Sequence, residues 1–414
     1  MRVLSDRLIR SGTILTFAAI FTSFINLAFH ALIGRTLTIE EYGSFQTLIA
    51  VGNSVTAPVL CISLLLTKNI SKLFSSERLD CIYPTFKFFN SWLMVASLIV
   101  LSVSFCFSEE ISDILNVENS NSVKLLFIVL AIGNITSLMM ATMQGLQQFS
   151  YSALYRVLHA ASKIFICWSL LLFFHGTVII ILVAALLGEL ILLLGCVLKL
   201  RNFYFMPSLG SKPLVSKPEL FLKTFFATVS LSIAMQIDII LVSLFYSPAE
   251  TGIYSAASTL AKAAVFLSAN YVSVMFPLVS GGKLTEKQKI KILVQVSFIT
   301  CLCGSLAGLG FLIFGNYLAF IILGRFDNDV GVLASTISFS LVPLALLHAF
   351  EHYFIAHDSV FVAWLLALCA PLVISSVYIF QNSLFSIPII IGVITALVVC
   401  ICIITLGRKK LIQC

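Results

Sequence analysis

The sequence predicts an all-α integral membrane protein of about twelve transmembrane helices, arranged as two parallel six-helix bundles around a central cavity. Three observations support this: the composition, the number of long apolar stretches and a short internal repeat. Of the 414 residues, 60% are hydrophobic and only 10% are charged, whereas about 25% are charged in an ordinary soluble domain. The mean hydropathy of +1.08 extends over the whole chain, so the bilayer is the solvent for most of the fold. A soluble enzyme, a nucleic-acid-binding module and a disordered protein are therefore excluded.

Twelve stretches reach the roughly 20 mostly apolar residues that a transmembrane helix needs. The connections between them are short and leave no room for a second, soluble domain. Arg2, Arg7 and Arg10 resemble the start of a signal peptide, but the first stretch exceeds the roughly 7–15 residues of a signal-peptide core, so we expect it to be retained. The stretches span residues 13–34, 44–67, 88–107, 124–143, 157–174, 177–198, 224–245, 253–276, 292–314, 332–356, 360–380 and 387–406.

The basic residues predict how the spans are oriented. Twelve spans place both termini on one side, and cytoplasmic loops carry the excess of Lys and Arg. With cytoplasmic termini, twenty of the 25 basic residues lie inside, and only Arg35, Lys124 and Arg325 lie in outside loops. The net charge of +7 is then mainly a signal of topology, with anionic lipid headgroups as the simplest partner. Nine of the eleven cysteines lie within apolar stretches, so we expect neither a disulfide framework nor a zinc knuckle.

An internal repeat divides the chain into a bundle over residues 1–207 and a bundle over residues 208–414. After the first span the chain reads Thr-Ile-Glu-Glu-Tyr-Gly-Ser-Phe, and after the seventh it reads Ser-Pro-Ala-Glu-Thr-Gly-Ile-Tyr. An even number of spans separates the copies, so the repeat is parallel, and two like-oriented bundles are a usual architecture for moving a solute across a bilayer. An offset of 209 residues superposes Glu41 on Glu250, Gly43 on Gly252 and Phe45 on Tyr254.

These residues also carry a resemblance to a known family. The Glu-Glu-Tyr-Gly turn at 40–43, the Pro-Ala-Glu-Thr-Gly-Ile-Tyr-Ser-Ala-Ala run at 248–257 and Asp238 in Gln-Ile-Asp-Ile-Ile resemble the polysaccharide-export branch of the multidrug/oligosaccharidyl-lipid/polysaccharide exporter superfamily. Within that branch the chain is most similar to O-antigen flippases of the Wzx type. The resemblance covers essentially the whole chain in length, span count and topology, and it implies the two-bundle fold of MATE transporters.

The resemblance implies a flippase of the bacterial inner membrane with both termini in the cytoplasm. Its cargo would be an undecaprenyl-diphosphate-linked oligosaccharide, an O-antigen or related repeat unit of lipopolysaccharide biosynthesis. Alternating access would carry it from the cytoplasmic to the periplasmic leaflet. The expected partners are this lipid-linked oligosaccharide, membrane lipids, a polysaccharide polymerase and a chain-length regulator, with no nucleic acid and no cofactor.

Polar residues follow one helical face in two spans, as expected for helices that line an aqueous cavity. Asn26 and His30 lie on such a face in the first span, and Lys262 and Asn270 in the eighth. The repeat offset relates Lys262 to Asn53, which is also polar. We expect these residues to contact substrate.

Lys262 is the most informative of them. A lysine near the middle of a span costs about 2.5–3.5 kcal/mol on the insertion scale, so it should face water or a partner. It would bind the lipid diphosphate or an acidic sugar, or it would pair with Asp238 or Glu189 and hold helices together. Asp238 and Glu189 are themselves intramembrane acids, suited either to such a pair or to a proton or cation site.

A row of cations rises into the membrane at the start of the fifth span, where Arg156, His159 and Lys163 share one helical face. Clustered cations recognise phosphate, so this row is a candidate first contact for a diphosphate headgroup arriving from the inner leaflet. The alternative is ordinary anchoring at the membrane surface, with the long side chains snorkelling to the headgroups.

An enzyme motif occurs in the tenth span. His348-Ala-Phe-Glu351-His352 matches the H-x-x-E-H pattern in which two histidines bind zinc beside a general-base glutamate. A catalytic zinc needs a third protein ligand, and no acidic residue follows Asp358. We therefore expect neither a metalloenzyme nor a metal site, and assign His352 to substrate contact and Glu351 to ion coupling.

The main alternative within transport is an ion-coupled multidrug or small-molecule exporter of the same fold. It would use a compact carboxylate-based cation site, which Asp238 could supply, whereas a flippase should have a cationic, polar cavity. The sequence contains no Walker A, nucleophile-elbow or dinucleotide motif. We therefore expect a transporter rather than an enzyme, driven by an ion gradient or by consumption of its product outside.

Overall fold

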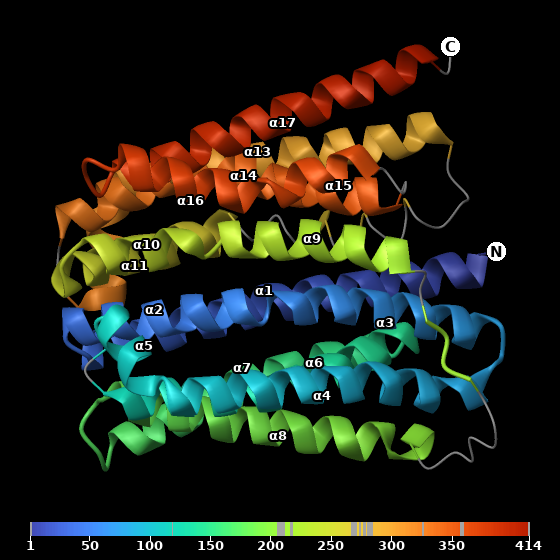
Figure 1. The fold of residues 1–414 in the computed structure, drawn as a ribbon, viewed down its shortest axis with the longest axis horizontal. Coiled ribbons are helices and arrows are strands. Elements are labelled where there is room, and N and C mark those ends of the chain that lie inside the picture. Colours follow the sequence, from blue (N-terminus) through green and yellow to red (C-terminus); the bar gives the residue numbers. More distant parts are fainter. Residues whose placement is uncertain are drawn as a thin grey trace. The chain divides into compact units, whose positions relative to one another are not determined.

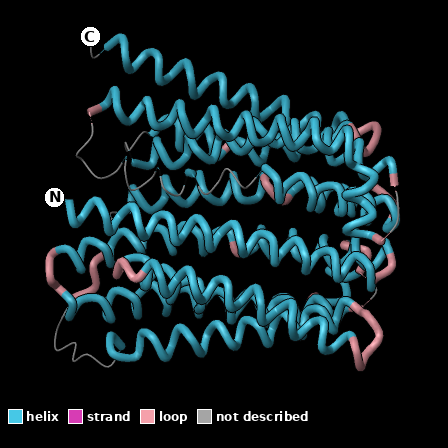
Figure 2. The backbone as a smooth tube through the Cα atoms, turned by 180° about the vertical axis from the view of Figure 1, so that it is seen from behind, coloured by secondary structure: helices cyan, strands magenta, loops and turns pink. Residues whose placement is uncertain are grey.

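In the computed structural model, the described residues are 2–117, 119–204, 212–215, 218–265, 271–272, 275, 279, 285–324, 327–356 and 360–412. Their regular structure is entirely helical (Figures 1 and 2), which confirms the all-α class. Each of the twelve predicted stretches coincides wholly or in part with one or two helices. By length and apolar composition, eight of the described helices could each cross a membrane, and one bent pair of helices adds a ninth span.

Contacts divide the chain into two compact units, residues 1–37 with 55–221 and residues 38–54 with 222–414. The predicted division at residues 207 and 208 lies outside the described residues and stays a prediction. The first unit contains α1 (Arg2–Thr36), α3 (Ala57–Ser75), η1 (Leu79–Cys81), α4 (Ile82–Cys106), α5 (Ser108–Ile114), α6 (Ser120–Gly145), α7 (Phe149–Leu171) and α8 (Val178–Tyr204). In this unit α7 packs on both α1 and α8, and α6 packs on α3, α4 and α8.

The second unit contains α2 (Ile39–Val55), α9 (Pro218–Ala234), α10 (Ile237–Phe245), α11 (Pro248–Val265), α13 (Glu286–Leu323), α14 (Asn328–Ala356), α15 (Val360–Ala367), α16 (Cys369–Phe380) and α17 (Ser386–Ile412). Here α14 packs on α11, α13 and α17. Helix α2 therefore belongs to the second unit, although most of the first unit comes after it in the sequence.

The predicted spans at 44–67 and 360–380 are each divided between two helices, α2 with α3 and α15 with α16. Two further spans differ from the helices in other ways. The stretch at 224–245 is bent by 49° between α9 and α10, which makes Asp238 part of the first turn of a new helix. The stretch at 292–314 is the middle of the 38-residue α13, about 57 Å long at 1.5 Å per residue and so longer than the roughly 30 Å hydrocarbon core. A capping box of Thr285 and Gln288 begins α13, and Gly324, with φ of 70°, ends it.

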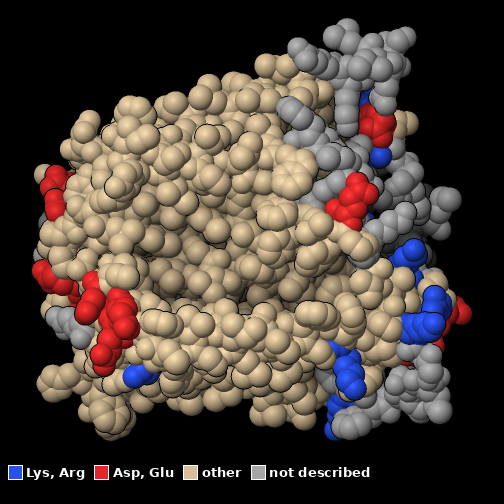
Figure 3. All heavy atoms as spheres, viewed as in Figure 1, with Lys and Arg blue, Asp and Glu red and all other residues tan. Residues whose placement is uncertain are grey.

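The charges on the surface follow the span pattern. On the face shown in Figure 3, the described Lys, Arg, Asp and Glu side chains lie at the two ends of the helices, and the band between them is uncharged. Large apolar side chains such as Phe165, Phe298 and Ile313 are exposed in the spans. Such a surface is unfavourable in water and is suited to lipid.

Both copies of the internal repeat are helix starts built in the same way. At α2 the Thr38 amide donates to Glu41 Oε2 (3.0 Å) and the Glu41 amide donates to Thr38 Oγ1 (3.2 Å). At α11 the Ser247 amide donates to Glu250 Oε2 (3.0 Å) and the Glu250 amide donates to Ser247 Oγ (3.3 Å). The Ser247 hydrogen bonds lower the pKa of the Glu250 carboxyl below its usual value. The repeated acid therefore occupies the N3 position of a capping box.

The repeated glycine has a different role, because it lets α2 and α11 touch. A Cβ atom on Gly252 would lie 2.0 Å from the Ile39 carbonyl oxygen, and one on Gly43 would lie 2.8 Å from the Gly252 nitrogen. Backbone atoms of the two helix starts meet here, so neither position has room for a side chain. The repeat thus encodes a contact between its own two copies within the second unit.

We expect Gly252→Ala to lower the free energy of unfolding by about 1–3 kcal/mol, since overpacking against backbone forces the helices apart. The measurement is the melting temperature of the purified protein in detergent. Gly310→Ala in α13 is the matched control, because a Cβ there meets nothing within 4 Å and alanine favours helix. Equal melting temperatures for the two variants would contradict the close contact.

Candidate functional site

The polar side chains predicted within the spans gather in three places, each inside one unit. We call the first, formed by Asn26, Lys163, His159 and Glu189, the α7 cluster. The second is the Asp238–Lys262 pair. The third, formed by His348, Glu351 and His352, is the α14 triad.

In the α7 cluster, the lysine contacts neutral groups. Lys163 Nζ donates to Asn26 Oδ1 at 3.3 Å and lies 4.3 Å from the centroid of the Phe29 ring. Gly188 on α8 packs against its stem, since a Cβ there would lie 3.3 Å from Lys163 Cβ. Among the described residues, no carboxylate oxygen lies within 4.0 Å of Lys163 Nζ. The cluster therefore contains an ammonium group held by an amide and an aromatic face.

The carboxylate of the α7 cluster, Glu189, contacts a histidine and a threonine. Glu189 Oε2 lies 2.9 Å from His159 Nε2, and Thr136 Oγ1 on α6 donates to Glu189 Oε1. Gly133, one turn before Thr136, lies beside the carboxylate, and a Cβ there would make an ordinary contact 3.5 Å from Glu189 Oε1. Glu189 thus pairs with the histidine of the predicted row of cations and not with Lys262.

The neighbours of the cluster lie along α1 and α7. His30 follows Asn26 by one turn, and its ring lies 6.0 Å from that of Phe29, edge to face. Arg156 is exposed on α7, one turn before His159. The structure therefore brings Asn26, Lys163 and Glu189 together, with His30 and Arg156 at either end.

The Asp238–Lys262 pair joins α10 to α11. Lys262 Nζ lies 2.8 Å from Asp238 Oδ1, and Ser258 Oγ donates to Oδ2 at 2.9 Å. Side-chain exposure is 3% for Asp238 and 12% for Lys262. The bend before α10 places Asp238 at a helix N-terminus, where the helix dipole stabilises its negative charge. The sequence left two roles open for Lys262, an ion pair and substrate binding. The structure shows the ion pair with Asp238, and binding to substrate stays a prediction.

A second polar group lies one turn from this pair and was not anticipated. Gln46 Nε2 on α2 donates to the Tyr42 hydroxyl at 2.8 Å and to Thr259 Oγ1 at 3.0 Å. The i, i+4 spacing of Tyr42 and Gln46, from the repeated turn into the following span, is the sequence signal for it. Of the remaining predicted contacts, Asn53 is exposed on α2, and Asn270 lies outside the described residues.

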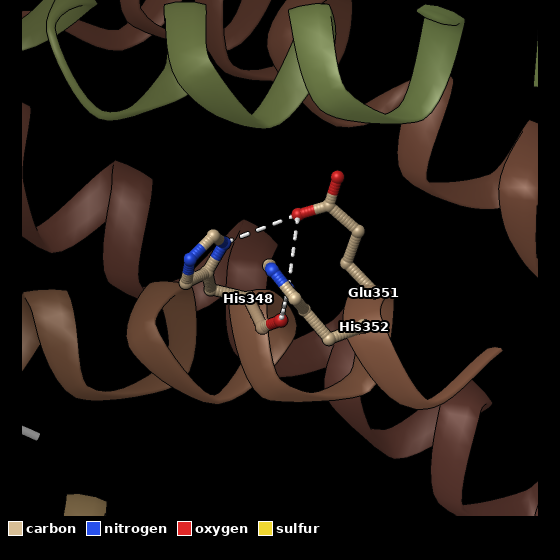
Figure 4. Close-up of side chains that lie close together, drawn as sticks. All are labelled: His348, Glu351 and His352. Atoms are coloured by element: carbon tan, nitrogen blue, oxygen red, sulfur yellow. Dashed lines mark hydrogen bonds and ion pairs between the residues drawn. The ribbon is translucent and has the colours of Figure 1, made fainter. Parts of the chain in front are cut away.

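The α14 triad surrounds one buried carboxylate (Figure 4). Glu351 Oε2 lies 3.1 Å from His348 Nδ1 and 4.0 Å from His352 Nδ1. Its other oxygen accepts a hydrogen bond of 2.7 Å from Thr228 Oγ1 on α9. His352 Nδ1 donates to the His348 carbonyl oxygen at 3.0 Å. The spacing i, i+3, i+4 places all three side chains on one face of α14, as predicted.

Comparisons with known proteins give both a family and a fold. A family model described as polysaccharide biosynthesis protein matches residues 8–283, about two thirds of the chain. No curated protein matches the chain by sequence. A eukaryotic MATE transporter, AtDTX14, superposes with a TM-score of 0.67 at 14% identity, over 96% of each chain. A ligand complex of the MATE multidrug transporter DinF-BH gives 0.66 at 14% identity, over 98% of this chain and 96% of that one.

A third similar structure is a transporter of the MOP superfamily from Pyrococcus furiosus. It superposes with a TM-score of 0.63 at 12% identity, over 98% of this chain and 95% of that one. Its description states that the reversed polarity of its binding pocket suggests a different function. These likenesses show that the chain has the fold of MATE transporters, as the sequence predicted.

We expect the Asp238–Lys262 pair to be required for stability. Lys262→Met leaves a buried carboxylate without its cation and should cost about 3–5 kcal/mol, much of which the double variant Lys262→Met, Asp238→Asn should restore. Thermal unfolding of all three proteins gives the coupling energy.

The Glu286–Lys289 pair provides the matched control. It has the same 2.8 Å separation, but Glu286 is 50% exposed, so Lys289→Met should cost about 1 kcal/mol or less. A double variant no more stable than Lys262→Met would show that the pair is not the reason for the loss.

Proposed function

Because the chain belongs to the polysaccharide biosynthesis protein family, we propose that it flips an undecaprenyl-diphosphate-linked oligosaccharide across the membrane. The family match over residues 8–283 is the observation that carries the proposal. The fold supports it, because MATE transporters are multi-pass membrane proteins that work without enzymatic chemistry. The cargo would be an O-antigen or related repeat unit, taken from the cytoplasmic to the periplasmic leaflet of a bacterial inner membrane by alternating access.

The α7 cluster gives the proposal a candidate binding site for the diphosphate. The contacts of Lys163 are to a neutral amide and a ring, and the acid of the cluster, Glu189, is held by His159 and Thr136. Arg156 is exposed two turns earlier on the same helix. A diphosphate carries charges that two cations at this spacing complement, and an arginine offers bidentate hydrogen bonds. Asn26 and His30 would add polar contacts beside Lys163.

The second unit would contribute differently. Lys262 is neutralised by Asp238, so it would contact an acidic sugar only as part of the pair. Asn53, Asn270 and His352 are further proposed substrate contacts. We propose that Asp238, Glu189 and Glu351 serve as ion-coupling sites or intramembrane pairs, and that the basic loops keep both termini in the cytoplasm. A polysaccharide polymerase and a chain-length regulator would act on the product.

The second candidate is an ion-coupled multidrug exporter. The observations that favour it are the buried carboxylate of Asp238 and the likeness to multidrug transporters such as DinF-BH. A cationic drug would require an anionic site, whereas the α7 cluster presents Lys163. Loss of the gene separates the two candidates.

Deletion of the gene in its native bacterium should abolish the surface polysaccharide, and lipid-linked sugars should accumulate on the cytoplasmic face. Restoration by the wild-type chain is the control, and extracted lipid-linked intermediates and surface polymer are the readouts. Normal surface polymer with raised sensitivity to dyes or drugs would contradict the flippase and support the exporter.

We expect Arg156→Ala with Lys163→Ala to reduce surface polymer at least tenfold, because the diphosphate would lose both cations. Arg35→Ala is the matched control, because Arg35 is an exposed arginine at the C-terminal end of α1. This variant should keep most of the surface polymer. Membrane levels of each variant are measured alongside. The reverse order of the two effects would move the headgroup site to the outer side.

A further inference from the structure

The α14 triad has the donor atoms of a metal site. One ring nitrogen each from His348 and His352 and one carboxylate oxygen of Glu351 all lie within 4.8 Å of one another. Zinc binds histidine nitrogen and carboxylate oxygen at about 2.0–2.2 Å, so tetrahedral donors stand about 3.3–3.6 Å apart. The separation from Glu351 Oε2 to His348 Nδ1 is 3.1 Å, and His352 would offer its Nε2, because its Nδ1 donates to the His348 carbonyl oxygen. Small side-chain rotations would therefore close the three donors on an ion.

The charge of the triad also calls for a cation. The Glu351 side chain is 1% exposed, and Thr228 satisfies one of its oxygens. The other oxygen faces the two imidazoles (Figure 4). A buried carboxylate needs a positive partner. A divalent ion between the three side chains would supply it.

The supporting contacts resemble those that orient metal ligands. The His348 carbonyl oxygen accepts from His352, and Thr228 holds the carboxylate from a second helix. Hydrogen bonds from outside the ligand set fix ring and carboxylate directions in metal sites in the same way. His348 is 32% exposed and His352 12%, which leaves an approach for the ion from outside the helix packing.

We propose that His348, Glu351 and His352 bind one divalent transition-metal ion of the zinc type. Two nitrogens and one oxygen are a donor set for Zn²⁺, Co²⁺ or Ni²⁺, whereas Mg²⁺ and Ca²⁺ prefer oxygen alone. The H-x-x-E-H pattern uses Glu351 as a general base and lacks a third ligand, whereas the positions of the three side chains allow Glu351 to be that ligand. With Glu351 as a ligand, the triad has no glutamate left as a general base, so the site is one for binding and not for hydrolysis. The inference goes beyond the proposed function and does not depend on it.

The test is metal titration of the full chain, purified in detergent without a polyhistidine tag and stripped with a chelator. Wild type should bind one Zn²⁺ per chain, and Co²⁺ should give visible absorption bands that Zn²⁺ abolishes. His348→Gln and His352→Gln should each weaken binding at least about 100-fold, and Thr228→Val about tenfold, since it removes only an orienting contact. His175→Gln is the control, because His175 is an exposed histidine between α7 and α8, and it should bind as wild type does.

Two results would overturn the proposal. One is the absence of stoichiometric Zn²⁺ binding by folded wild-type protein. The other is binding that survives both His348→Gln and His352→Gln, with Co²⁺ bands typical of thiolate ligands, which would place the metal on cysteines. Because His348 is partly exposed, His348→Gln should fold even if Glu351→Gln does not. The helical content of each purified variant is measured to check this.

Discussion

A buried charge has to be matched inside the protein, because the bilayer offers no water to solvate it. Glu189, Asp238 and Glu351 are each held by a cationic or protonatable partner and by a hydroxyl group. Each match joins different helices: α7, α6 and α8 at Glu189, α10 and α11 at Asp238, α14 and α9 at Glu351. These contacts therefore tie the helices within each unit where apolar packing alone would leave their register weakly specified.

Several local features of the fold serve this constraint. The bend between α9 and α10 places Asp238 in the first turn of a helix. Gly188 leaves space beside the Lys163 stem, because a Cβ there would lie 3.3 Å from Lys163 Cβ. One lysine differs from this pattern: Lys262 is paired with an acid, whereas Lys163 contacts an amide and a ring. A cation whose contacts are an amide and a ring is better suited to an anionic ligand than a cation paired directly with an acid, so the proposed headgroup site lies in the first unit.

The sequence predicted the features that depend on the hydrocarbon thickness and on local spacing. Apolar length and helical period predicted the positions of the spans and the shared face of His348, Glu351 and His352. They also gave the contact of Lys262 with Asp238 as one of two alternatives. The partner of Glu189 could not be predicted, because His159 lies on another helix and many polar residues were equally placed. Nor could the sequence show that α2 packs in the second unit, since that depends on backbone contact at Gly43 and Gly252.

Reconstitution into sealed vesicles tests whether the protein moves a lipid-linked oligosaccharide. The vesicles would contain a labelled undecaprenyl-diphosphate oligosaccharide, and the measurement is the fraction of sugar accessible to a membrane-impermeant reagent over time. We expect faster exchange between leaflets with the protein than in protein-free vesicles. Unchanged exchange of the lipid-linked sugar, together with uptake or extrusion of a lipophilic cationic dye by the same vesicles, would contradict it.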